Sequence, residues 1–353
     1  MPLRLAFMIV AVVLPGLCSD WSPQRAAEFL DARQKEWFGW PTAKSVGGPC
    51  VSCHTGLTYL LARPALRRAL GEKEPTSYER GLQDGLRARL EKKTASELSP
   101  NGKEPFASQK LGVEAILSAL LLTVGERGSE TLSPEAKQAF DRLWSLQIAD
   151  GKAKGSWQWF NLDLDPWETP DSAFYGASLA ALAAGYAPSG YRRRPDVRKH
   201  IGDLTEYLLR EQQSQPLHNR LALLWASSRL PEAMPESTRE SVVQELLKRQ
   251  QPDGGWTLES LGSWGPHPEA PPSSGSNSYA TAFAAFVLEQ ARVPHAGAGL
   301  KRSLDWLRSR QDRERGYWSA GSMNKPYDEG SMQIRFMQDA ATGFASLALL
   351  ESR

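Results

Sequence analysis

The sequence predicts an all-α protein built as a closed ring of helical hairpins. One turn motif, Gln-x-x-x-Gly-x-Trp, recurs along the chain between two kinds of helix. The helix before each turn has one polar face, whereas the helix after it is small and apolar on nearly every side. A helix that is apolar all round is buried on both sides, and a helix with a polar face lies at the surface. The alternation therefore predicts an inner and an outer set of helices.

The turn motif has three clear copies. LLKRQQPDGGW contains Gln250, Gly254 and Trp256 at the regular spacing. The other two copies carry insertions. One comprises Gln311, Gly316 and Trp318, and the other comprises Gln147, Gly155 and Trp157. Degraded copies lie near Gln34 and Gln212. We expect each Trp to be buried where two hairpins meet, and each Gln to hydrogen-bond exposed helix ends.

The apolar helices are expected to surround one space inside the ring. Their predicted starts are near Leu111, Ser172, Leu217, Ser278 and Asp339. Residues 45–105 do not follow the repeat, so we interpret them as an insertion that carries the cysteine motif and a charged linker. The remainder of 19–353 is predicted to form the ring.

The repeated turns resemble those of squalene-hopene cyclases and oxidosqualene cyclases, over most of Trp21 to Arg353. The resemblance implies an α/α toroid with a central apolar cavity. Class II cyclases protonate an alkene with the middle carboxylate of an Asp-x-Asp-Asp-Thr-Ala motif. The matching segments here, 277–282 and 338–343, keep Thr-Ala and Thr-Gly but lack that acid. No cysteine follows Cys53, so the zinc site of the related prenyltransferases is absent as well. Cyclase chemistry is therefore not predicted.

Several polar residues are expected to face the cavity. Glu114 and Arg220 occupy equivalent inward positions, where they would form a buried pair or bind a polar ligand group; alternatively, one lies a turn away in solvent. The other predicted cavity residues are Thr281, Thr342, Asp165, Glu168 and Asp171.

The start of the chain predicts export. Arg4 precedes an apolar run, Leu5 to Leu17, that has the length of a signal peptide and is too short to span a membrane comfortably. We assign residues 1–18 to this signal and expect a periplasmic protein that does not span the membrane. Lipidation at Cys18 is a weaker alternative, because Leu17 and Pro15 fit a lipobox poorly. A formal charge of +2 gives no reason to expect nucleic acid as a partner.

Cys50, Cys53 and His54 form a Cys-x-x-Cys-His segment. This pattern is typical of covalent haem c attachment, in which the two thiols bond the vinyl groups and the histidine is the proximal iron ligand. A disulfide between Cys50 and Cys53 is the main alternative, and it leaves His54 without a role. The favoured distal ligands are His218 and Met323; the other candidates are His200, His267, His295, Met234, Met332 and Met337, and an open sixth position is equally compatible.

These features lead to one functional hypothesis and one rival. The first is an exported haem protein acting in electron transfer or oxidation, with a redox protein or an apolar molecule such as an isoprenoid or a quinol as its partner. The rival is a non-haem cyclase-like or ligand-binding toroid with a disulfide. The sequence does not decide whether the protein is an enzyme.

Overall fold

A computed structural model of the chain describes residues 21–262, 264, 270, 274–292 and 297–352. The signal peptide predicted at 1–18, with Cys18, lies outside these residues. The described part is mostly helical, with fourteen α-helices and one two-stranded sheet, which confirms the all-α class. The sheet pairs β1 (Lys44–Ser45) with β2 (Gly48–Pro49) in antiparallel register.

Six helices form an inner set and six an outer set. The inner helices are α2 (Gly56–Leu70), α5 (Phe106–Val124), α7 (Ser172–Tyr186), α10 (Leu217–Ser227), α12 (Ser278–Gln290) and α14 (Phe336–Glu351). The outer helices are α1 (Pro23–Gly39), α3 (Ser77–Arg89), α6 (Pro134–Ser145), α9 (Pro195–Glu211), α11 (Glu236–Lys248) and α13 (Ala298–Arg310). Two short helices, α4 (Ala95–Leu98) and α8 (Ser189–Arg192), complete the fourteen.

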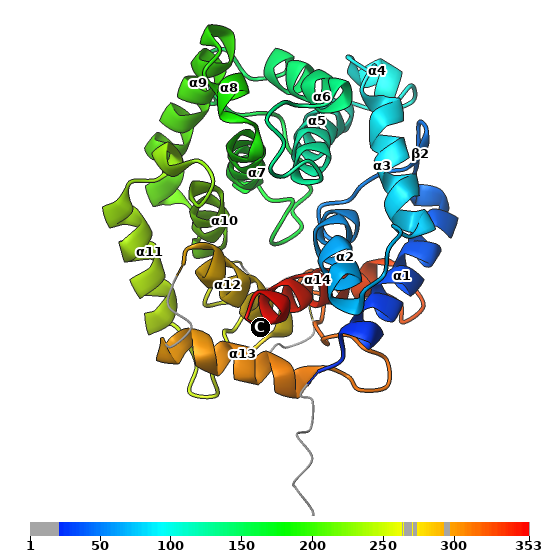
Figure 1. The fold of residues 1–353 in the computed structure, drawn as a ribbon, viewed down its shortest axis with the longest axis vertical. Coiled ribbons are helices and arrows are strands. Elements are labelled where there is room, and N and C mark those ends of the chain that lie inside the picture. The colour runs from blue at the N-terminus through cyan, green and yellow to red at the C-terminus, as the bar shows by residue number, and fades with distance from the viewer. Residues whose placement is uncertain (1–20, 263, 265–269, 271–273, 293–296, 353) are drawn as a thin grey trace, which may run out of the picture.

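The inner helices contact one another in a cyclic order. Figure 1 shows them around the centre of the molecule, with the outer helices surrounding them. Helix α14 contacts α2, and the contacts continue through α5, α7, α10 and α12 back to α14. Each outer helix packs against the inner helix that neighbours it, as α6 does against α5 and α13 against α12.

The composition of the inner helices explains their place. Helix α7, SAFYGASLAALAAGY, buries twelve of its fifteen residues and has no charged side chain. Helix α5 is apolar and long enough to cross a membrane by composition alone, but 83% of its apolar window is buried inside this protein. Burial against neighbouring helices, rather than against lipid, accounts for its composition.

The structure corrects two sequence-based boundaries and one interpretation. Helix α5 begins at Phe106 rather than near Leu111, and α14 begins at Phe336 rather than near Asp339. The segment 45–105 does not stand apart from the ring, because its helix α2 lies between α14 and α5 and contacts both. The sequence did not indicate that α2 is an inner helix, because it contains three arginines. Nine of its fifteen residues are nevertheless buried.

The Trp of each clear turn lies beneath the outer helix that precedes it. Trp157, Trp256 and Trp318 are each at most 1% exposed, which confirms their predicted burial. Their indole nitrogens donate to the carbonyls of Leu143, Leu246 and Leu307 over 2.7, 2.8 and 2.8 Å. Each indole N–H thus fixes the Trp to a carbonyl in the last turn of the preceding outer helix.

The Gln of each turn joins two outer helices. Its side-chain amide donates to the carbonyl of the turn glycine and to a carbonyl of the next outer helix or of its N-cap. The second acceptors are His200 for Gln147, Gly299 for Gln250 and Ser22 for Gln311, at 3.0, 2.7 and 3.0 Å. Gln311 bonds a helix end, the N-cap Ser22, as predicted, whereas Gln147 and Gln250 bond carbonyls within α9 and α13. In all three turns the partner belongs to the neighbouring hairpin.

Glycine is required in these turns for two reasons. Gly155 and Gly316 have φ angles of +93° and +84°, a conformation that side chains disfavour. A Cβ atom at Gly155 would also lie 2.1 Å from the carbonyl oxygen of Asp203, and one at Gly316 would lie 2.2 Å from that of Arg25. The turn backbone therefore packs directly on the backbone of the next outer helix.

Candidate metal centre

The Cys-x-x-Cys-His segment leads into the first turn of α2. Ser52, between the two cysteines, accepts hydrogen bonds from the backbone N–H groups of Thr55 and Gly56 at 3.0 and 3.1 Å. These bonds satisfy N–H groups that a helix start leaves without intrahelical partners. Trp37 of α1 donates its indole N–H to the Cys50 carbonyl at 2.8 Å. The segment is therefore held between α1 and α2.

The two cysteines are free thiols in different surroundings. Cys53 is buried and lies 3.8 Å from a carboxylate oxygen of Glu168. Burial, and then the charge of Glu168, raises the pKa of the Cys53 thiol well above its ordinary value. Cys50 is half-buried; burial, and then the charge of Glu114, raises its pKa to about 11. Both sulfurs are therefore protonated at neutral pH when no cation is bound.

His54 is enclosed by aromatic rings and held by a chain of hydrogen bonds. Its Nδ1 lies 2.9 Å from the Thr55 hydroxyl, which in turn donates to Asp339 of α14 at 2.7 Å. Asp339 also accepts two hydrogen bonds from the guanidinium of Arg33, at 2.7 and 3.1 Å. The chain thus links the histidine to a buried ion pair between α1 and α14.

This chain sets the tautomer of His54. The single Thr55 hydroxyl proton goes to Asp339, so the Thr55 oxygen accepts a proton from Nδ1 of the ring. Burial, and then the charge of Arg33, lowers the pKa of His54 to about 3, which keeps the ring neutral. Nε2 therefore carries a free lone pair. A histidine whose second nitrogen donates to a fixed acceptor is the usual form of a metal ligand.

Glu168 comes from the loop between α6 and α7. Its backbone N–H donates to Leu164 at 2.9 Å, and its carbonyl accepts from Leu162 at 2.8 Å, so a tight turn fixes the residue. Burial raises the pKa of its carboxyl to about 7, against the hydrogen bond from Cys53, which lowers it. In Figure 1 this loop extends from the α6–α7 side toward the centre of the ring.

Cys53, His54 and Glu168 bring three potential ligand atoms together. The Cys53 sulfur, a ring nitrogen of His54 and a Glu168 carboxylate oxygen all lie within 4.8 Å of one another. Ligands of one Zn²⁺ ion at bond lengths of about 2.0–2.3 Å are separated by roughly 3.3–3.8 Å. Movements of about 1 Å would therefore place all three on a single ion.

His54, the predicted proximal ligand of a haem, is packed among aromatic rings. The ring of His54 stacks on Phe336 with centroids 3.8 Å apart, and Trp37 and Trp167 lie 6.0 and 5.8 Å from it. Only 8% of His54 is exposed. The thiol of Cys50 is influenced by the charges of Glu114, Lys110 and Arg89, whereas that of Cys53 is influenced by Glu168. Haem attachment would require Phe336 and its neighbours to move away from His54.

Glu114 and Arg220 do not meet, which corrects the idea of a buried pair between them. Glu114 accepts from Arg89 of α3 at 3.0 Å, with both side chains buried. Arg220 pairs with Glu245 of α11 at 2.6 Å and is half-buried. Each charge is paired with an arginine or glutamate of a neighbouring outer helix rather than with a residue on the opposite side of the ring.

The two predicted cavity threonines have a structural role instead. Thr281 accepts from the backbone N–H of Trp256 at 3.0 Å, and Thr342 accepts from that of Trp318 at 3.2 Å. Both threonines are fully buried. They fix the Trp turn to the following inner helix, which explains why Thr recurs at this position.

Two of the three predicted loop acids are not ligands of the centre. Asp165 is half-buried; burial, and then the charge of Asp163, raises its pKa to about 6. Its backbone N–H and carbonyl bond the side chain of Asn324 at 2.8 and 3.0 Å. Asp171 is exposed at the start of α7. Of the three, only Glu168 reaches Cys53.

His218, one of the two favoured distal haem ligands, has hydrogen-bond partners on both ring nitrogens. His218 bonds Tyr279 through Nε2 at 2.8 Å and Asn219 through Nδ1 at 3.1 Å, so neither nitrogen is free for iron. His200 bonds Gln147 in a Trp turn. The sulfur of Met332 accepts from Arg33 at 3.6 Å, and Met323 packs against the core. Met234 and Met337 are buried in the core, and His267 and His295 lie outside the described residues.

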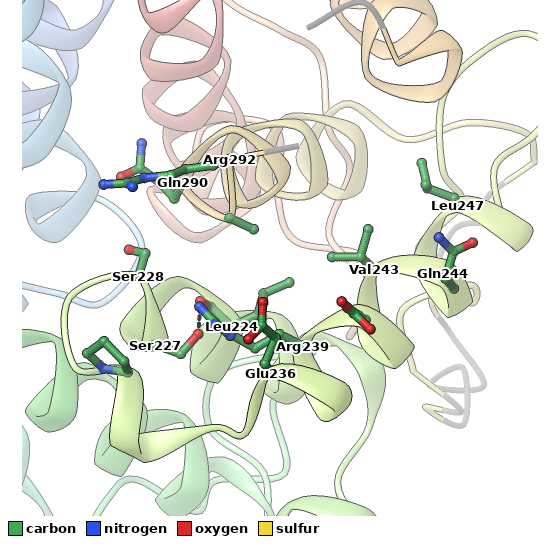
Figure 2. Close-up of a pocket in the computed structure, with 13 residues that line it drawn as sticks. Leu224, Ser227, Ser228, Glu236, Arg239, Val243, Gln244, Leu247, Gln290 and Arg292 are labelled. Carbon is green, nitrogen blue, oxygen red and sulfur yellow. Dashed lines mark hydrogen bonds between the residues drawn. The ribbon is translucent and has the colours of Figure 1, made fainter. Parts of the chain in front are cut away.

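Aromatic side chains of the inner helices contact one another. Phe344 of α14 contacts Trp225 of α10, with centroids 6.3 Å apart, and Phe283 of α12 at 5.0 Å. A cavity of about 620 Å³ lies between α10, α11 and the end of α12. Figure 2 shows its lining, which includes Ser227, Arg239 and Arg292.

Sequence reasoning missed the residues that support His54. Arg33 lies in α1, Thr55 at the start of α2 and Asp339 in α14. Arg33 and Asp339 are 306 residues apart. Thr55 directly follows His54 in the sequence, but nothing in the sequence indicates that Asp339 accepts its hydrogen bond. No protein-family model matches the chain, and no curated protein matches it either.

Proposed function

We propose that this protein binds a single transition-metal ion of the Zn²⁺ type through Cys53, His54 and Glu168. The observation that carries the proposal is the convergence of these three side chains within 4.8 Å. Sulfur, imidazole nitrogen and carboxylate oxygen are the donors that Zn²⁺ takes in proteins. A thiolate and a carboxylate also balance the charge of a dication, which a buried site requires.

The number of ligands indicates what such an ion would do. Three protein ligands and an open fourth position are typical of catalytic zinc, whereas structural sites have four protein ligands. Cys50 is not part of the convergent group. A bound ion of this kind polarises a carbonyl or lowers the pKa of a water molecule at the open position. We therefore propose a Lewis-acid centre rather than a structural one.

We also propose that the scaffold is an α/α toroid of the squalene-cyclase kind, in an exported protein. The cyclic contacts of the inner helices and the three repeated Trp turns support the scaffold. The apolar run from Leu5 to Leu17 supports export. Terpene cyclisation is not proposed, because Asp339, the acid nearest the motif position in α14, is engaged by Arg33 and Thr55.

Covalent haem is the second candidate for the same segment. The five-residue Cys-x-x-Cys-His pattern at a helix start, with both thiols free, favours it. Electron transfer or oxidation, with a redox protein or an apolar molecule as partner, would then be the function.

One set of measurements separates the two candidates. The full chain is produced with and without haem-maturation machinery, and its intact mass and metal content are measured. The ion proposal expects about one equivalent of zinc and no added haem mass; the haem candidate expects the full mass of haem and a covalent Soret band. A mass deficit of two hydrogens with no metal would contradict both and indicate a Cys50–Cys53 disulfide.

Variants assign the ligands. Cys53→Ser, His54→Ala and Glu168→Gln should each weaken zinc binding by at least about tenfold, because each removes a ligand. Cys50→Ser and Glu206→Gln, an exposed glutamate of α9, are the matched controls and should bind like the parent. The ion proposal fails if Glu168→Gln binds zinc normally, or if Cys50→Ser loses as much affinity as Cys53→Ser.

A further inference from the structure

Both ends of the segment that carries Glu168 are bonded to one buried chain of side chains. At the first end, the indole N–H of Trp167 donates to the hydroxyl of Tyr279 in α12 at 3.0 Å. That hydroxyl lies 2.8 Å from Nε2 of His218 in α10. All three side chains are buried. The residue directly before Glu168 is thus tied to two inner helices.

The other end of the segment is bonded to the same chain. Asn219, also buried, follows His218 in α10 and donates its amide N–H to the carbonyl of Asp171 at 3.1 Å. Its side-chain oxygen lies 3.1 Å from Nδ1 of His218. The chain therefore runs without a break from Trp167 to Asp171, and Glu168 lies on the loop between these two ends.

The protons of this chain have one consistent arrangement. The carbonyl of Asp171 only accepts, so the Asn219 amide nitrogen faces it and the amide oxygen faces His218, which places a proton on Nδ1. Burial lowers the pKa of His218 to about 4, although the hydrogen bond to Asn219 raises it, so the ring is neutral and Nε2 accepts from Tyr279. The indole N–H of Trp167 can only donate. Each of these donors has an acceptor, and a buried polar network in that state is rigid.

Glu168 requires support of this kind. Its tight turn fixes the residue within its own loop, but not relative to Cys53. Burial disfavours its charged carboxylate, and the thiol of Cys53, which lies 3.8 Å away, is only a weak hydrogen-bond donor. Trp167, the preceding residue, packs against both Tyr279 and His54, with ring centroids 5.1 and 5.8 Å away. The anchored Trp167 therefore determines where Glu168 meets the other two ligands.

We propose that Tyr279 is a positioning residue of the metal centre. Its hydroxyl, held by His218, fixes Trp167 and thereby keeps the Glu168 carboxylate against Cys53. The effect of Tyr279 on ion binding rests on the proposed function, whereas the placement of Glu168 against Cys53 does not. Residues that orient metal ligands through hydrogen bonds commonly change metal affinity by about 10–100-fold.

A double-mutant cycle tests this role on the full chain, with zinc affinity measured by competition with a chelator. Tyr279→Phe should weaken zinc binding by about tenfold. Glu168→Gln combined with Tyr279→Phe should bind zinc no more weakly than Glu168→Gln alone, because the ligand that Tyr279 positions is already gone. A residue that only stabilises the fold would not show this coupling.

Tyr59→Phe is the matched control. Tyr59 of α2 is fully buried, and its hydroxyl also has two partners, Asp31 and Thr76, at 2.8 and 2.7 Å. These bonds join α2 to α1 and to the N-cap of α3 rather than to the Glu168 loop. The control should therefore lose stability while it binds zinc like the parent.

A second readout needs no metal. The S–H stretching band of Cys53, identified in the infrared spectrum by its loss in Cys53→Ser, reports the hydrogen bond to Glu168. Tyr279→Phe should shift this band in the same direction as Glu168→Gln does, because both remove that bond. If the parent binds no zinc, the metal proposal fails and this shift alone decides the role of Tyr279.

Two results would overturn the role of Tyr279. One is a Tyr279→Phe variant that keeps the parental zinc affinity or, where no zinc binds, the parental S–H band. The other is a loss of affinity that adds fully to that of Glu168→Gln, which would assign the effect to general packing. Should Tyr279→Phe fail to fold, Asn219→Leu, which removes the bond to Asp171, is measured in the same way and should show the same coupling.

Discussion

Gln311 and Ser22 bond each other twice although 289 residues separate them. The Gln311 side-chain amide donates to the Ser22 carbonyl at 3.0 Å, and the Ser22 backbone N–H donates to the Gln311 side-chain oxygen at 2.6 Å. Gln147 and Gln250 make the corresponding bond to the next outer helix in their own turns. In the last repeat, α1 therefore takes the place of the next outer helix.

The first prediction concerns this contact. Gln311→Ala should lower the free energy of unfolding by about 1–3 kcal/mol, because it leaves the backbone N–H of Ser22 and the carbonyl of Gly316 without these partners. Urea unfolding measures the change. Gln24→Ala, an exposed position in the same region of α1, is the control and should change stability little. An equal loss of stability in both variants would mean that the two hydrogen bonds between Gln311 and Ser22 have no special role.

The second prediction concerns the Trp turns. Trp256→Ala should cost about 3–5 kcal/mol, because it empties a fully buried site and removes the donor to Leu246. Trp256→Phe should cost less, since most of the apolar volume remains. Thermal melting distinguishes this structural role from a role in ligand binding. A variant that keeps the parental melting temperature but loses ligand binding would contradict the prediction.

The third prediction tests the support of His54. Thr55→Val keeps the shape of the side chain but removes the acceptor for Nδ1, so metal affinity should fall by about 10–100-fold. Competition with a chelator measures that affinity. Thr58→Val is the matched control, because Thr58 is equally buried in α2 but bonds only backbone carbonyls, those of His54 and Thr55. Equal losses in the two variants would show that the hydrogen-bond chain is not the cause.

The fourth prediction concerns pH. Burial, and then the charge of Glu351, raises the pKa of Glu289 in α12 to about 9, while Arg308 lowers it. The folded protein then keeps a proton that the unfolded chain releases above pH 4.5. Stability attributable to this group is therefore greatest at low pH and decreases as pH rises toward 9, by at most about 1.4 kcal/mol per pH unit.

Chemical unfolding at pH 5 and pH 8 checks this prediction. Glu289→Gln cannot titrate, so its stability should fall less between the two pH values than that of the parent protein. Glu240→Gln, an exposed acid of α11, should keep the parental dependence. A parental slope in the Glu289→Gln variant would assign the pH dependence to other groups.

Local pattern was sufficient for the repeated elements. The starts of α7, α10 and α12, at Ser172, Leu217 and Ser278, agree with those expected from composition. The burial of the three turn tryptophans follows from the same repetition. These features depend on interactions within one hairpin and its neighbour, so every copy of the repeat contains the sequence pattern that predicts them.

Site residues were harder to place because their partners are distant in sequence. Glu114 and Arg220 occupy matching positions, but an outer helix supplies a counter-charge to each, and no periodicity encodes which one. Glu168 was expected in a cavity, and only the packing of its loop brings it to Cys53.

The sequence by itself determined the helical class, the alternation of apolar and amphipathic helices outside 45–105, the Trp turns and the Cys-x-x-Cys-His segment. Only the tertiary structure decided that α2 lies between α14 and α5, and that Asp339 fixes His54 through Thr55. The physical reason is the range of the forces involved. Helix periodicity and turn geometry are local, whereas a ligand set or a buried ion pair depends on which distant side chains share one dehydrated space.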